Sequence, residues 1–358
     1  MKKIKYVIYI LFVLNNGTIG AETSEKSDNS LKPQMRPELE FFVDLHRMQH
    51  FFDISQRSSS YSTQPIENQE FVLNHAYAQG SIDSKRFRGQ LALHTGSYVA
   101  INYAAEPQIY RNILRANGGF QIIDNLWLDA GVFDSHIGME SGVSRDNPTV
   151  TRSLMADLSP FFETGLSVSY ETKQFSAKLL AINGWQRIKD NNKDIGLGTQ
   201  IQFKPADHIT LNSSTYYGNE QDTGHRPRVF HNFYVQHAVG DFSYAFAFDI
   251  GAEKSSSSSN YLEWWGTALI LRYALSEEFA TALRLEHYHD RHQVIVTTNS
   301  RNGFQTSGAS VNFDYTPMKQ VLLRLEVRWL NAKDKIFQDA NQVINNDAFI
   351  LLSTAFTF

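Results

Sequence analysis

Apolar and polar residues alternate along most of this chain, in segments of about ten residues that are separated by polar stretches. The last segment, residues 346–358, shows the pattern most clearly, because apolar side chains recur at every second position up to Phe358. A period of two predicts an extended strand, whose successive side chains point to opposite faces. A strand that ends the chain leaves an unpaired edge, and pairing with the first strand of a closed barrel would satisfy that edge.

Sixteen segments share this alternation, and we predict that all of them are strands. They are residues 39–48, 70–80, 86–96, 109–120, 124–134, 161–171, 174–184, 195–204, 208–218, 228–239, 241–252, 261–275, 279–290, 304–316, 320–331 and 346–358. Seven short links alternate with eight long polar ones. This order is typical of an all-β, up-and-down antiparallel transmembrane barrel, with short periplasmic turns, long extracellular loops and both termini on the short-turn side. Counts of fourteen or eighteen remain alternatives, since the first and fourth segments carry the weakest pattern.

The two faces of each strand predict which side meets lipid. Within residues 321–330, Arg324, Glu326 and Arg328 alternate with leucine, valine and tryptophan. An arginine on the lipid side at mid-bilayer costs about 2 to 4 kcal/mol, so we expect the charged face to line the lumen. The same register predicts a set of charged wall residues: Arg88, Arg115, Asp129, Lys178, Arg272, Arg284, Glu286, Arg324, Glu326 and Arg328, with Asp44, Asp249 and Asp314. Their near balance of sign predicts no ion preference, and pairing across strands to stiffen the wall is the alternative role.

Composition agrees with a membrane barrel. The mean hydropathy is negative, and no run of 18 apolar residues follows the N-terminus, which excludes a bundle of spanning helices. Only alternate residues of a barrel strand meet lipid, so an overall polar chain is expected. The absence of cysteine excludes disulfides, a thiolate metal site and a lipidated N-terminal cysteine. The net charge is −4, or −7 without the three N-terminal lysines, and argues against nucleic acid as a partner.

The N-terminal region predicts export. Residues 1–21 have the order of a secretory signal peptide, with three lysines, an apolar run over residues 6–14 and small residues at Gly20 and Ala21, either of which could precede the cleavage site. A membrane anchor is the less favoured alternative, because the apolar run is shorter than a spanning helix. Residues 22–37 are polar and predict a periplasmic lead-in, so the barrel itself is expected over residues 38–358.

The longest connection, residues 135–160, is the first candidate for a functional segment. Long loops in compact proteins are usually functional or disordered. A long loop that folds into a wide barrel would narrow its channel, and charges on that loop would create a local field across the pore. We therefore predict that Glu140, Arg145, Asp146 and Arg152 lie at the pore constriction. The alternative is an exposed extracellular loop with solvated charges.

Other chemistry is sparse. His287, His289 and His292 cluster near Asp290, where a rim of solvated histidines is favoured over a metal site. The chain has no hydrolase elbow, phosphate-binding loop or zinc-protease motif. We expect no catalytic residues, no metal and no cofactor. A barrel hydrolase with a Ser–His pair on neighbouring strands is the remaining enzymatic alternative.

Several short motifs in the middle of the chain carry a family resemblance. They are Asp129-Ala130-Gly131-Val132-Phe133-Asp134, Ile137-Gly138-Met139-Glu140, Asp146-Asn147-Pro148, Thr151-Arg152-Ser153, Ser159-Pro160, Thr164-Gly165 and Asn183-Gly184-Trp185-Gln186. In this order they resemble the OmpL-like β-barrel porins, or porin-2 family, over residues 38–358. Thr151 departs from an expected serine, and the first strand is less recognisable. The terminal strand also resembles the sorting signal of bacterial outer-membrane barrels, which implies that Phe356 and Phe358 act in sorting and closure.

Pattern and resemblance together predict a passive porin of the bacterial outer membrane that serves small hydrophilic solutes. A sixteen-stranded barrel is wide enough to hold a water-filled lumen. The expected partners are outer-membrane lipid, the barrel assembly machinery and the solutes, and a homo-oligomer is a further candidate. The alternative function is a barrel plugged by its own loops, which would serve adhesion or envelope structure.

Overall fold

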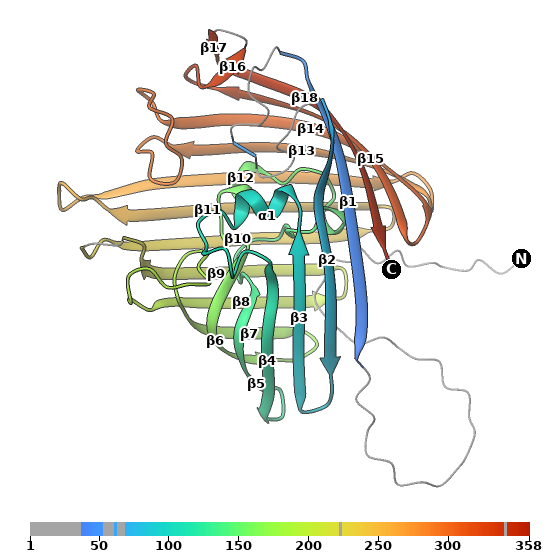
Figure 1. The fold of residues 1–358 in the computed structure, drawn as a ribbon, viewed down its shortest axis with the longest axis vertical. Helices are drawn as coiled ribbons and strands as arrows, with labels where there is room; N and C mark the ends of the chain where they lie inside the picture. The colour runs from blue at the N-terminus through green and yellow to red at the C-terminus, as the bar shows by residue number, and fades with distance from the viewer. Residues whose placement is uncertain (1–36, 53–60, 63–68, 222–223, 340–341) are drawn as a thin grey trace, which may run out of the picture.

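The computed structural model describes residues 37–52, 61–62, 69–221, 224–339 and 342–358. In this part of the chain, sixteen strands form one closed antiparallel barrel, and Figure 1 shows them following one another around it. The predicted signal peptide and nearly all of the predicted lead-in, residues 1–36, lie outside the described residues.

Every predicted strand is present, with ends that differ by a few residues from those expected. The barrel strands are β1 (Glu38–His50), β2 (Phe71–Asp83), β3 (Phe87–Thr95), β4 (Ile113–Ile123), β5 (Leu126–Asp134), β6 (Phe162–Glu171), β7 (Phe175–Ile182), β8 (Gly196–Ala206), β9 (Ile209–Asn219), β10 (Pro227–Val239), β11 (Phe242–Lys254), β12 (Tyr261–Ala274), β13 (Phe279–Asp290), β14 (Phe304–Met318), β15 (Val321–Ala332) and β18 (Asn346–Thr357). The two strands that the sequence marks least clearly, β1 and β4, are both part of the sheet.

The barrel closes where its last strand meets its first. The pairing of β1 with β18 runs from Phe42 opposite Thr357 to His50 opposite Phe349. At its end, the N–H of Phe358 donates to the carbonyl of Phe41 at 2.9 Å, and the N–H of Phe41 donates back at 3.1 Å. This pairing leaves no free edge in the sheet, and it confirms that the C-terminal strand seals the barrel.

Exposure separates the two faces of the wall. On β15, Leu325, Val327 and Trp329 are 36%, 39% and 46% exposed on the outer surface. The charged residues between them, Arg324, Glu326 and Arg328, are at most 1% exposed. The outer face therefore presents apolar side chains to lipid and the inner face carries charge, as the alternation predicts.

Some elements lie in the loops and were not expected from the sequence. They are helices α1 (Ser97–Asn102) and α2 (Leu154–Asp157), the 3-10 turn η1 (Ser144–Asp146), and the hairpin of β16 (Phe337–Asp339) and β17 (Gln342–Ile344). Helix α2 is capped by Ser153, whose side chain accepts from the N–H of Ala156 at 3.3 Å. No helix of the described chain is long and apolar enough to cross a membrane.

Candidate functional site

The segment between β5 and β6, residues 135–161, folds into the barrel, and we call it the inner loop. It starts from a hairpin in which Gly131 and Gly165 face each other with positive φ angles of 126° and 158°. A Cβ at either position would lie 2.1 Å from a carbonyl oxygen of the neighbouring strand. Only glycine fits this close approach, which explains the two glycines in the motifs described above.

Backbone groups of the inner loop are held by charged residues of the wall. The guanidinium of Arg324 donates to the carbonyl oxygens of Ser144 at 2.7 Å and Asn147 at 2.9 Å. The carboxylate of Glu286 accepts from the N–H of Leu154 at 2.6 Å. The inner loop therefore lies against the inner faces of β13 and β15.

The same wall contains a network of buried charges. Arg284 lies 3.4 Å from Glu286 and 3.1 Å from Glu326, and Arg328 lies 2.8 Å from Glu286. All four side chains have no exposed surface. Buried charges are tolerated only when they are paired and their remaining hydrogen bonds are satisfied. Glu326 meets this need through the N–H and hydroxyl of Thr151, at 2.7 and 2.8 Å, so the inner loop completes the network.

Asp44 joins the inner loop to the line where the barrel closes. This fully buried residue of β1 accepts from Asn74 of β2 at 3.1 Å and from Ser353 of β18 at 3.0 Å. It also accepts from the hydroxyl of Ser144 at 2.6 Å, and His46 lies 2.9 Å away. One carboxylate thus contacts the first two strands, the last strand and the inner loop.

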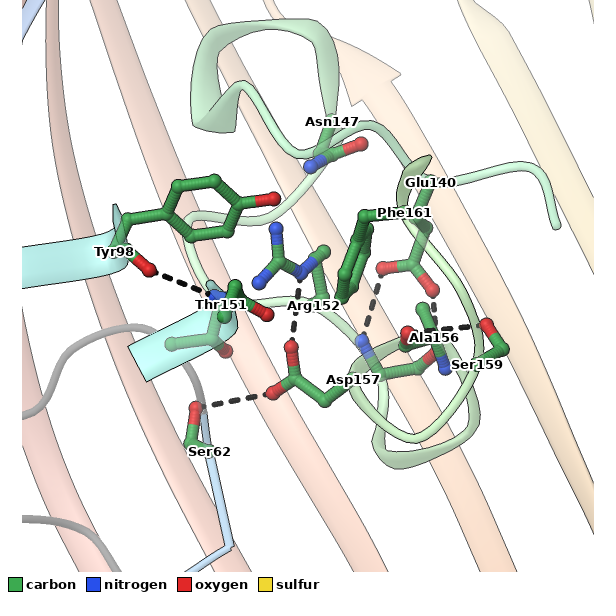
Figure 2. Close-up of polar contacts among 12 residues, drawn as sticks. Ser62, Tyr98, Glu140, Asn147, Thr151, Arg152, Ala156, Asp157, Ser159 and Phe161 are labelled. Atoms are coloured by element: carbon green, nitrogen blue, oxygen red, sulfur yellow. Dashed lines mark hydrogen bonds and ion pairs between the residues drawn. The ribbon is translucent and has the colours of Figure 1, made fainter. Parts of the chain in front are cut away.

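Two of the four constriction candidates, the buried Arg152 and the partly buried Glu140, are held within the fold of the inner loop. The guanidinium of Arg152 lies over the rings of Tyr98 and Phe161, at 5.0 and 4.0 Å, and pairs with Asp157 at 2.9 Å, as Figure 2 shows. Glu140 accepts from the backbone N–H and the hydroxyl of Ser153. Burial raises the pKa of Glu140, although Arg284 and the Ser153 hydrogen bonds act in the opposite direction. Both residues therefore hold the conformation of the inner loop.

The other two candidates, Arg145 and Asp146, reach the periplasmic mouth. Arg145 donates to the carbonyl of Lys319, in the short turn between β14 and β15, and to the hydroxyl of Thr357 at 2.9 Å. Both residues line a cavity of about 620 Å³, together with Glu40, Arg272 and other residues at that end of the barrel. Burial raises the pKa of Asp146 to about 6, against the opposing influence of Arg115.

Apolar side chains of the inner loop fill the centre of the barrel. Ile137, Leu154 and Met155 belong to one buried cluster with wall residues of β7 and β9 to β15, among them Trp264 and Tyr288. The packing is close, since a Cβ at Gly266 would lie 2.9 Å from the Cβ of Met155. The lumen at this height is packed like the interior of a soluble protein.

Some charged side chains of β3 to β7 are more exposed than those of the wall that the inner loop covers, although the inner loop also contacts β6 and β7. We call β13 to β15 with β18 the covered wall and β3 to β7 the open wall. On the open wall, the side chains of Arg88 and Glu171 pair at 3.0 Å and are 29% and 31% exposed. Arg115 pairs with Asp134, which is 57% exposed, at 2.7 Å. Asp129, which pairs with Arg88 at 2.6 Å, and Lys178 are also partly exposed.

Sequence reasoning did not single out several residues that hold the inner loop. Ser144 and Thr151 bind charged wall residues, and His136 pairs with Glu163 at 2.9 Å while its other ring nitrogen lies 3.0 Å from the carbonyl of Thr215. Serine and threonine residues of a polar loop follow no regular spacing, so the sequence does not show which of them contact the wall. Glu163, Ser167 and Ser169 lie on the same face of β6, because even numbers of positions separate them along the strand. This alternation could have marked Glu163 as inward-facing.

The histidines near the end of β13 do not gather around a metal. His287 and His289 both point to the outer face of the strand, with Tyr288 pointing inward between them. No group of three metal-ligating side chains occurs in the described chain.

Comparisons with known proteins agree with this architecture. The family described as "Putative beta-barrel porin-2, OmpL-like" matches residues 42–358. No curated protein matches the chain.

Three solved barrels illustrate the structural similarity. The outer membrane channel DcaP of Acinetobacter baumannii aligns with a TM-score of 0.63 at 10% identity, covering 93% of this chain and 100% of that one. The anion-selective porin from Comamonas acidovorans gives 0.58 at 9%, covering 91% and 100%. OmpT of Vibrio cholerae in its trimer form gives 0.58 at 7%, covering 90% and 99%. At these identities the similarity concerns the fold, whereas the family match covers nearly the whole barrel. The chain belongs to the OmpL-like β-barrel porin-2 family and is a channel protein of the bacterial outer membrane.

Proposed function

We propose that this porin conducts small hydrophilic solutes along the open wall, between β3 to β7 and the inner loop. The support is the contrast between the two walls. Arg284 and Glu326 have no exposed surface on the covered wall, whereas Arg88, Glu171 and Asp134 keep between 29% and 57% of their side chains exposed. A hydrated solute needs polar groups that water can reach, and the open wall provides them.

The inner loop is the constriction in this proposal. It occupies the covered wall and the centre of the barrel, so it reduces the cross-section left for solutes. Arg145 and Asp146 are the loop charges that a passing solute would meet, because they line the cavity at the periplasmic mouth. Glu140 and Arg152 act indirectly, by holding the conformation of the loop.

The open wall carries both signs of charge at short range. Arg88 contacts two carboxylates, Asp129 and Glu171, and Arg115 contacts Asp134. Paired charges give a strong local field but little net charge. We therefore expect hydrated neutral or zwitterionic solutes to pass more readily than large ions of either sign. Passage is passive in this proposal, and needs no cofactor.

The packed centre of the barrel favours the second candidate, a plugged barrel with a structural or adhesive role. A measurement of conductance distinguishes the channel from the plugged barrel. Purified protein in a planar bilayer should give discrete channel openings, and replacing residues 146–151 with a short Gly-Ser link should enlarge them, since this removes contacts to Arg324, Arg284 and Glu326. A matched link in the serine-rich tip at residues 255–259 should leave the conductance unchanged. A parent protein that inserts but never conducts would favour the plugged barrel.

We also propose that the porin assembles as a homo-oligomer through part of its outer apolar surface. The Vibrio cholerae barrel of similar fold is described in a trimer form, which supports the proposal by analogy. The mass of the detergent-solubilised complex, measured by native mass spectrometry, tests it, and a single-chain mass would contradict it.

A further inference from the structure

Near the extracellular end of β13, the outward side chains change from aliphatic residues to histidines. Along this strand, Leu283 and Leu285 are exposed to lipid at 37% and 47%, and the next two outward residues are His287 and His289. At the opposite end Phe279, 47% exposed, stacks on Tyr315 with ring centroids 4.6 Å apart. Phe279 and His289 are ten residues apart, which is about 33 Å of strand, or about 25 Å along the membrane normal at a tilt of about 40°. The histidines therefore lie at the outer edge of the apolar band.

An aromatic shelf supports these histidines. The ring of His289 stacks on Trp265 of β12 with centroids 5.6 Å apart and planes 10° from parallel. His287 lies against the same indole at 5.0 Å, and Phe248 of β11 follows at 6.3 Å. His287 Nδ1 is 2.9 Å from the hydroxyl of Ser307. The rings are thus held in place on the outer surface.

Basic groups surround the shelf. Lys333 follows the end of β15 and is exposed, with its ammonium 3.5 Å from the side-chain oxygen of Gln305. Arg291 and His292 are exposed directly after β13. Within the described chain, none of Lys333, Arg291 or His289 lies within 4 Å of a carboxylate.

Acidic residues near the shelf offset part of this positive charge. Asp290 points inward, where its carboxylate accepts from the N–H groups of Val294, Ile295 and Val296. Asp334 accepts from Asn302. Glu263, two residues before Trp265 on the same face, is the exposed carboxylate on this side of the rim. Lys333 and Arg291 thus place positive charge beside the shelf, with the carboxylates of Glu263 and Asp334 nearby.

We propose that Trp265, His287, His289 and Lys333, which we call the rim patch, bind the phosphate group of phosphorylated lipids in the outer leaflet. Lys333 supplies charge and up to three donors, and a ring N–H of His289 supplies one more. The indole and imidazole rings pack along the sugar or glycerol part of the headgroup, at the depth where amphipathic aromatic side chains are favoured. Basic residues next to a membrane each strengthen binding to anionic lipid. The proposal rests on the outer-membrane location and is independent of the conduction route.

Lipid retention tests this proposal. The full-length mature protein is placed in phosphatidylcholine nanodiscs that contain bisphosphorylated lipid A, and bound lipid is counted by native mass spectrometry. Lys333→Ala should weaken retention about fivefold, and adding His289→Ala should weaken it further. Lys254→Ala, at the exposed last residue of β11, is the charge-matched control and should retain lipid like the parent.

Two further binding experiments test whether the phosphate group and the apolar part of the lipid are both needed. Enzymatically dephosphorylated lipid A should bind the parent no better than it binds the double variant. Inorganic phosphate should not displace the lipid, because it lacks the apolar part. Equal retention by parent and double variant, or equal binding of dephosphorylated lipid, overturns the proposal. Heat-modifiable gel migration of each variant confirms that the barrel is folded, and both substituted side chains lie outside the packed interior.

Discussion

The hydroxyl of Ser144 in the inner loop donates to Oδ2 of Asp44 on β1 at 2.6 Å. Because Asp44 also accepts from Ser353 of β18, the tip of the inner loop and the closing strand share one carboxylate. Closure of the barrel and docking of the inner loop are therefore energetically linked.

Ser144→Ala should loosen this link. The substitution removes one hydrogen bond to a buried carboxylate, for which a loss of about 1 to 3 kcal/mol is expected. Urea unfolding of the detergent-solubilised barrel should show a lower midpoint, and bilayer recordings should show more frequent changes of current level. Ser257→Ala, in an exposed loop tip, is the control. An unchanged midpoint for the Ser144 variant would show that the contact contributes nothing.

Glu326→Ala should be among the most destabilising single changes on the covered wall. It leaves Arg284 with one carboxylate fewer and removes the acceptor of the Thr151 N–H, with no exposed surface through which water could compensate. Breaking a buried ion pair from one side costs about 3 to 5 kcal/mol. Unfolding free energies of this variant and of the exposed Glu277→Ala measure the difference. A loss equal to that of the exposed control would contradict the network described above.

Labelling with a membrane-impermeant thiol reagent should distinguish the two walls. Cysteine at Gln90, on the open wall and partly exposed, should react, whereas cysteine at Arg324 or Arg328, covered by the inner loop, should not. Cysteine at Leu325 or Val327 faces lipid and should also remain unlabelled. The native chain has no cysteine, so each signal reports one site. Shortening the inner loop should make position 324 reactive, and strong labelling of that position with the loop intact would place the open route elsewhere.

Acid should favour the docked inner loop through Asp146. Burial raises the pKa of this carboxyl from 3.8 to about 6, with Glu40 acting in the same direction and Arg115 and Arg145 in the opposite one. A raised pKa means that the protonated form is favoured in the docked loop. This contribution is complete below about pH 4 and is lost as the pH rises through about 6. Conductance should therefore fall between pH 7.5 and 5, and Asp146→Asn should flatten that dependence. A variant with the parent's pH profile would assign the effect to another group.

The strands and their register could be predicted because each obeys a local rule. An inward arginine such as Arg324 and an outward leucine such as Leu325 follow from the cost of placing charge in lipid, whatever the rest of the fold does. The same rule places Asp44 on the inner face, since it shares the parity of the other inward residues of β1.

The interior of the lumen could not be predicted in the same way. Whether Arg152 meets solvent or the rings of Tyr98 and Phe161 depends on how two loops pack, and alternation contains no information on that. The four-residue helix α2 is stabilised by its contacts with the wall, since a helix this short is marginal alone. Loop length and charge thus selected the constriction candidates, and only the structure separates Arg145 and Asp146 at the mouth from Glu140 and Arg152 inside the loop.

The apolar cluster around Leu154 and Trp264 gives this barrel a second hydrophobic surface, on the inside. A wide water-filled pore accepts many side chains on its lumen face, because each meets only solvent. Here the inward positions near Gly266, Ala268 and Tyr288 have fixed volumes to fill. At the height of this cluster, tolerance to substitution should therefore be reversed relative to an open channel: the lipid-facing positions accept exchange among apolar residues, whereas the lumen-facing positions of the cluster are as restricted as the core of an enzyme.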